Sequence, residues 1–143
     1  MESTVISTHA LAAYASTGRV SASRDGLVVF HPTGTNYELY LACDPAYAGL
    51  VGRKVNALII AQARKVWTVP SGGNFISPIF GPPKIVQGRV RLVEGNRLIL
   101  HAGTDFVIDL PVDDSAIELA HGAFGRGTMI NCTLQPGAKF EII

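Results

Sequence analysis

Residues 18–41 read GRVSASRDGLVVFHPTGTNYELYL, and residues 88–110 repeat the pattern as GRVRLVEGNRLILHAGTDFVIDL. Each copy opens on Gly-Arg-Val, continues through a short turn sequence, and carries a histidine at the end of its next apolar run. A match of this length at a fixed spacing is typical of a duplicated supersecondary unit. We therefore predict an internally duplicated chain.

Large apolar side chains alternate with other residues at the end of each copy, which is the period of a strand with one buried face. The inward set comprises Tyr37, Leu39, Leu41 and Cys43 in the first copy and Phe106, Ile108, Leu110 and Val112 in the second. An alignment with a one-residue deletion in the second copy matches Cys43 with Val112 and places Cys132 near Ile59. Both cysteines are therefore predicted to be buried thiols that pack as small hydrophobic side chains.

Short turn sequences separate the expected strands, at residues 24–26 and 94–96 and again at 32–35 and 102–104. A capping Asp or Ser and a later Gly favour a short helix within 113–122. We predict an all-β fold in which two OB-like or SH3-like small barrels pack together. The alternative is one closed barrel built from two β-β-β-(α)-β half-units.

The expected division of the chain has four parts. Residues 1–17 form an N-terminal extension, 18–69 the first barrel repeat, 70–87 a connector, and 88–143 the second barrel repeat. The connector is rich in Gly and Pro but also carries Phe75, Ile76, Ile79 and Phe80, which a free linker would not expose. We expect it to dock on the barrels or on a neighbouring chain, and these four side chains are the candidates for self-association.

The composition favours contact with other proteins over attraction to charged surfaces. Of the 143 residues, 48% are hydrophobic and only 16% are charged, so the surface must expose uncharged area. A net charge of +1 supplies no global attraction to nucleic acid or to anionic lipid. No apolar run reaches the roughly 18 residues of a membrane span, and no signal peptide is recognised, so a cytoplasmic homo-oligomer is the expectation.

The stretch GGNFISPIFGPPKIVQGRV at residues 72–90 and the closing LQPGAKF at 134–140 support a family assignment. Together they resemble segments of uncharacterised bacterial proteins with predicted OB-like small β-barrels, and the likeness covers about residues 72–143. The resemblance implies a fold and brings no catalytic residue.

Equivalent histidines, His31 and His101, invite a metal or acid–base interpretation, but no further ligand or carboxylate follows at a suitable spacing. A residue that ends a strand and hydrogen-bonds the next turn would be duplicated with that strand, so a structural role is the favoured interpretation. No phosphate loop or nucleophile motif is present. We expect no enzymatic activity, no metal and no cofactor.

A second class of function is a single-stranded nucleic-acid-binding module. Its candidate residues are the basic side chains of the first repeat with the single tryptophan: Arg53, Lys54, Arg64, Lys65 and Trp67. A third possibility is a small-ligand or glycan site in a barrel mouth, which depends on the fold alone. The first hypothesis remains a self-associating structural protein.

Overall fold

The computed structural model describes residues 11–44, 47–49, 51–111 and 125–143. A 3-10 turn, η1 (Ala12–Tyr14), precedes eleven strands. These are β1 (Ser16–Arg24), β2 (Leu27–Pro32), β3 (Glu38–Ala42), β4 (Lys54–Thr68), β5 (Phe75–Ser77), β6 (Phe80–Gly81), β7 (Ile85–Glu94), β8 (Arg97–His101), β9 (Asp105–Asp109), β10 (Met129–Leu134) and β11 (Lys139–Ile142). The all-β prediction is confirmed, whereas Val112 and the helix expected within 113–122 lie outside the described residues. In the described parts, no helix is long and apolar enough to cross a membrane.

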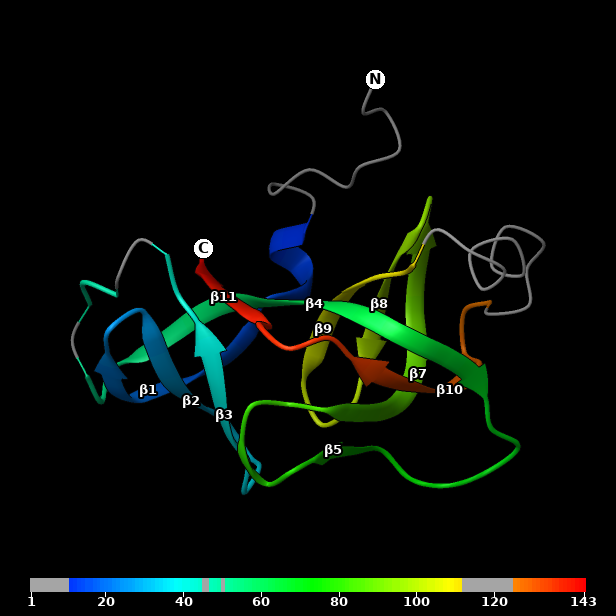
Figure 1. Ribbon diagram of the computed structural model, residues 1–143, viewed down its shortest axis with the longest axis horizontal. Helices are drawn as coiled ribbons and strands as arrows, with labels where there is room; N and C mark the ends of the chain where they lie inside the picture. The colour runs from blue at the N-terminus through cyan, green and yellow to red at the C-terminus, as the bar shows by residue number, and fades with distance from the viewer. Residues whose placement is uncertain (1–10, 45–46, 50, 112–124) are drawn as a thin grey trace.

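All eleven strands belong to one mixed sheet, and the 15-residue β4 runs through its centre (Figure 1). The N-terminal end of β4 pairs with β1, and its next residues pair with β11. Because β11 also meets β3 in parallel, the strands β1, β2, β3, β11 and β4 close a ring of five.

The C-terminal end of β4 takes part in a second set of pairings. It pairs with β10 through residues 63–68 and, in parallel, with β9 through residues 60–62. Since β10 pairs with β7, β7 with β8 and β8 with β9, these strands also return to β4. Below, the first ring denotes β1, β2, β3, β11 and β4, and the second ring denotes β4, β10, β7, β8 and β9.

The hairpins β1–β2 and β7–β8 have the same register, offset by 70 residues. Arg19 faces His31 as Arg89 faces His101, and both hairpins shift register at the same point, after Val20 and after Val90. The Gly-Arg-Val repeated in both copies thus occupies the same position in the two hairpins, which pair identically.

The third strands match differently from the alignment expected above. Nine positions separate Phe30 from its partner Leu39, but only six separate Leu100 from its partner Phe106, so the second connection is three residues shorter. Leu39 therefore corresponds to Phe106, not to Ile108.

Backbone hydrogen bonds fix the place of Cys43, and strand pairing fixes that of Cys132. The Cys43 amide donates to the Gly26 carbonyl as the Leu110 amide donates to that of Asn96, so Cys43 corresponds to Leu110 and not to Val112. Cys132 pairs with Val86, and Ala57 pairs with Ser16, 70 residues before Val86. Cys132 thus corresponds to Ala57, which corrects its expected place near Ile59.

The inner faces of both rings form one hydrophobic core. Its largest fully buried side chains include Phe30, Leu39, Leu41, Leu98, Leu100 and Phe106. The predicted inward set is thus buried where it is described, except that Tyr37 is only half-buried.

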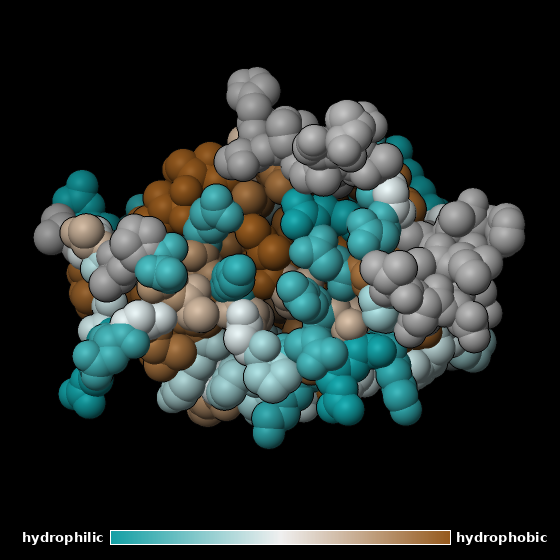
Figure 2. Space-filling model, turned by 45° about the horizontal axis from the view of Figure 1, so that its top comes forward, coloured by the Kyte–Doolittle hydropathy of each residue, from teal (hydrophilic) through white to brown (hydrophobic). Residues whose placement is uncertain are grey.

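A smaller apolar cluster lies on the outside of the second ring. Leu58, Ile99 and Val107 are buried there beneath Leu11 and the partly buried Tyr14. Figure 2 shows apolar residues (brown) gathered toward the left of the face in view. Leu11 and Tyr14, just before β1, therefore pack on the sheet.

Gly88 lies where β7 approaches the end of β8, and we expect it to tolerate no side chain. A Cβ atom added there would meet the His101 carbonyl oxygen at 2.0 Å, which only a backbone shift could relieve. Gly88→Ala should lower the free energy of unfolding by about 1–3 kcal/mol, measured by urea denaturation. Gly73→Ala is the matched control, because no atom lies within 4 Å of its added Cβ. Equal stability of the two variants would contradict the close approach.

Candidate functional site

The connector docks on its own chain and touches both rings. β5 pairs with β7 of the second ring, and β6 pairs with β3 of the first. Two further bonds fix it to the first ring: the Ile76 amide donates to the Tyr37 hydroxyl at 3.1 Å, and the Glu38 amide donates to the Ile79 carbonyl at 2.8 Å. Figure 1 shows this segment along the lower edge of the molecule.

The four apolar side chains of the connector have two different environments. Ile76 is 3% exposed and continues an inner row across the second ring, where it faces Val86. Phe75, Ile79 and Phe80 are 36%, 53% and 63% exposed. Ile76 therefore packs in the core and is not accessible for self-association, whereas the other three remain candidates.

Phe80 adjoins an apolar area on the outer face of the first ring. It faces Glu38 on β3, and two residues further along the same face Tyr40 lies opposite Val29. Leu27 follows on this face, opposite Ala42. We name this area the connector surface, comprising Leu27, Val29, Tyr40, Ile79 and Phe80. All but the half-buried Val29 are large hydrophobic side chains that solvent reaches.

The predicted basic residues separate into two groups. Arg53 and Lys54 lie at the start of β4, where Lys54 faces Arg19. Arg64 and Lys65 are exposed near its other end, about 35 Å further along an extended strand. The structure thus brings only the second pair close to Trp67.

Trp67 begins a row of paired residues that sequence reasoning did not find. It faces Asn131 on β10, Asn131 faces Gln87 on β7, and Gln87 faces Phe75 on β5. Paired residues point to the same face of a sheet, so this row lies on the outside of the second ring. Its two ends are aromatic and exposed, at 45% for Trp67 and 36% for Phe75.

The neighbouring rows add basic side chains to this face. Lys65 lies two residues from Trp67 on β4, and Arg89 lies two residues from Gln87 on β7. Arg89 is held in place by a 2.9 Å hydrogen bond to the Gly127 carbonyl. We name this area the stacking face, comprising Lys65, Trp67, Phe75, Gln87, Arg89 and Asn131.

The two amides in the middle of the stacking face are 9% exposed and hydrogen-bonded to each other. Asn131 Nδ2 donates to Gln87 Oε1 at 3.0 Å, and Gln87 Nε2 donates to the Gly73 carbonyl at 3.0 Å. Buried amides without partners would cost free energy, whereas this chain of bonds fixes both side chains. The floor between the two aromatic rings is therefore rigid and polar.

The equivalent histidines both bond to the turn that follows them. His31 Nδ1 lies 2.9 Å from the Tyr37 carbonyl, and His101 Nδ1 lies 2.8 Å from Asp105 Oδ1. Asp105 also accepts a hydrogen bond from Arg91. These contacts agree with a structural role, and within the described residues no three His, Cys, Asp or Glu side chains are grouped to hold a metal ion.

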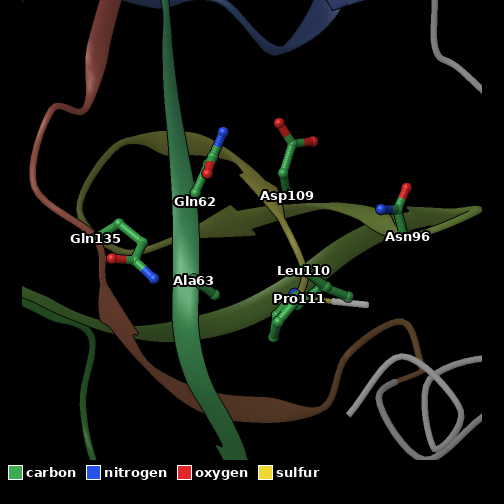
Figure 3. Close-up of a pocket in the computed structure, with 7 residues that line it drawn as sticks. All are labelled: Gln62, Ala63, Asn96, Asp109, Leu110, Pro111 and Gln135. Carbon is green, nitrogen blue, oxygen red and sulfur yellow. The ribbon is translucent and has the colours of Figure 1, made fainter. Parts of the chain in front are cut away.

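A hollow of about 490 Å³ lies where β9 meets β4 in parallel (Figure 3). Gln62 and Asp109 face each other across this pairing, and their side chains point the same way, above Leu110 and Pro111. Asp109 accepts hydrogen bonds of 2.5 and 3.1 Å from Arg97, and this bonding raises the pKa of Arg97 above its ordinary value. The hollow is open and polar, and its amides could bind ligand hydroxyls, so the small-ligand or glycan interpretation stays a prediction.

A second hollow, of about 410 Å³, occupies the corresponding place where β3 meets β11. Ala42 and Lys139 face each other there, as Asp109 and Gln62 do in the first hollow. The two positions therefore share backbone geometry and differ in chemistry.

No protein-family model, curated protein or solved structure matches this chain.

Asp105, the first residue of β9, bonds to Arg91 on β7 and His101 on β8, so its charge should matter for stability. Its side chain is about 10% exposed and accepts hydrogen bonds from Arg91 and His101. We expect Asp105→Asn to lower the free energy of unfolding by about 1–3 kcal/mol, measured by urea denaturation. Asp25→Asn, at an exposed hairpin position, is the control and should cost under about 0.5 kcal/mol. A similar effect of both changes would contradict the linking role.

Burial raises the pKa of the Cys132 thiol to about 12, from an ordinary 9.0. At pH 8 such a thiol presents about a thousandfold less thiolate, which is the reactive form. In a Cys43→Ser variant, Cys132 is the single cysteine. We expect it to react with Ellman's reagent only after unfolding in guanidinium. Reaction of the folded variant at the rate of the unfolded one would show that Cys132 is accessible.

Proposed function

We propose that this protein is a non-enzymatic structural protein that self-associates through the connector surface. The observation that carries the proposal is the exposure of Ile79 and Phe80, at 53% and 63%, beside the exposed Tyr40 and Leu27. Exposed apolar side chains gathered on one face of a protein often mark a protein–protein contact. The proposed fold is a pair of OB-like units, and the identical registers of β1–β2 and β7–β8 support the duplication.

A second copy of the same chain is the proposed occupant, because the surface carries opposite charges at its edges. Arg24 faces Leu27 at one edge, and Glu38 faces Phe80 at the other. In a two-fold contact each surface meets its own copy, so Arg24 of one chain can approach Glu38 of the second chain. A net charge of +1 adds little repulsion between copies.

Side-chain packing is the proposed mode of contact, not addition of a strand. β5 and β6 are three and two residues long, and prolines follow both of them. Short edges with prolines oppose strand pairing between chains. The apolar side chains are therefore expected to supply most of the association free energy.

Sedimentation velocity at increasing protein concentration tests this proposal. We expect the wild-type chain to dimerise and an Ile79→Ser/Phe80→Ser variant to weaken the dimer about 30-fold or more, as loss of an apolar interface centre does. Trp67→Ser is the control, since it removes an exposed aromatic side chain from another face. Circular dichroism checks that both variants remain folded. A wild-type chain that stays monomeric at about millimolar concentration would overturn the proposal.

A further inference from the structure

The stacking face differs in character from the connector surface. The connector surface carries four exposed apolar side chains on and beside the outer face of the first ring, whereas on the stacking face two amide side chains separate Trp67 from Phe75. Neighbouring strands lie about 4.8 Å apart, so the two aromatic residues are about 14 Å apart across the sheet. An apolar protein surface packed here would bury the two amides in the middle of this face. A ligand with flat apolar faces and polar edges would fit it better.

The charge on the stacking face has one sign. Lys65 and Arg89 lie in the rows on either side of Trp67 and Gln87, and Arg64 is exposed beside Lys65 at the point where the β4–β10 register shifts. None of the described residues that pair between β4 and β10, between β10 and β7 or between β7 and β5 is acidic. The one acidic residue of β7, Glu94, lies at the far end of that strand, opposite Arg97. The nearest described carboxylate by pairing, Asp105, already accepts hydrogen bonds from Arg91 and His101.

Flat rings, amides and a one-signed basic rim suit a polyanion whose bases are exposed. Each nucleobase has a π-face that can stack on an aromatic side chain and an edge that can bond to amides, and each phosphate is attracted to Lys or Arg. A duplex keeps its bases stacked on one another, so only a single strand can place them on Trp67 and Phe75. We infer that the stacking face binds single-stranded nucleic acid, with bases on Trp67 and Phe75 and phosphates near Lys65 and Arg89.

Trp67 is the single tryptophan of the chain, so its fluorescence reports directly on this face. The probe is a ten-nucleotide oligothymidylate, titrated into the full-length protein at about 50 mM salt, with the uridine oligomer as a second arm that compares the two sugars. We expect quenching that saturates and weakens steeply as salt rises. Phe75→Ala should weaken binding about tenfold, because stacking on one aromatic side chain contributes about that factor. Lys65→Gln should reduce the slope of log affinity against log salt by about 0.7.

Matched controls on the same protein separate this site from other surfaces. Phe80→Ala removes an exposed aromatic from the connector surface, and Lys54→Gln removes an exposed lysine from the far end of β4. Both variants should bind like the wild type. Phe80 belongs to the proposed self-association surface and lies outside the stacking face, so this control holds whether or not the chain self-associates. No quenching with either oligomer at low salt would overturn the inference. So would equal loss of affinity in the Phe75 and Phe80 variants, since binding would then not be located on the stacking face.

Discussion

The continuity of β4 is the constraint on which the rest of the molecule depends. Its first residues complete the first ring beside β1 and β11, and its last residues complete the second ring beside β9 and β10. Neither ring can close without β4, because two strands of each ring pair with it: β1 and β11 in the first ring, and β9 and β10 in the second. The apolar inward side chains of β4, including Ala57, Ile59 and Ala61, therefore belong to one shared core. Separating the rings would expose that core and break both ladders together.

Much of the local structure could be predicted from the sequence, and the long-range pairing could not. Alternation identified the strands and the buried face of Leu39, Leu41 and Cys43, because a period of two is a local property. The same alternation cannot fix register to better than two residues, since a shift of two keeps every side chain on its face. Aligning Gly34 with Gly103 and Thr35 with Thr104 placed Leu39 opposite Ile108, which is two residues from its true counterpart, Phe106. The hydrophobic pattern gave no sign that the connection after β8 is three residues shorter.

The candidate surfaces show the same limit. Trp67 was recognised as a candidate, but its row partners Asn131 and Phe75 lie on strands far from it in sequence, and only pairing brings them together. Arg53 and Lys54 were grouped with Arg64 and Lys65 because they are near in sequence, yet a long straight strand is the arrangement that holds such neighbours furthest apart. Ile76 was grouped with its exposed neighbours because the connector has too few residues to display a period.

The strand partners also have a consequence for how the chain is held together. The C-terminal half of β4 leaves the strands that precede it and joins those that follow, while β11 returns to the first set. The parts of the chain before and after the connector are therefore interlocked, because each contributes strand residues to the ring formed mainly by the other. A short covalent link keeps the two halves at a high effective concentration, so each finds its counterpart at a rate independent of how dilute the protein is. Cutting the chain within the connector would turn one folding reaction into an association of two fragments.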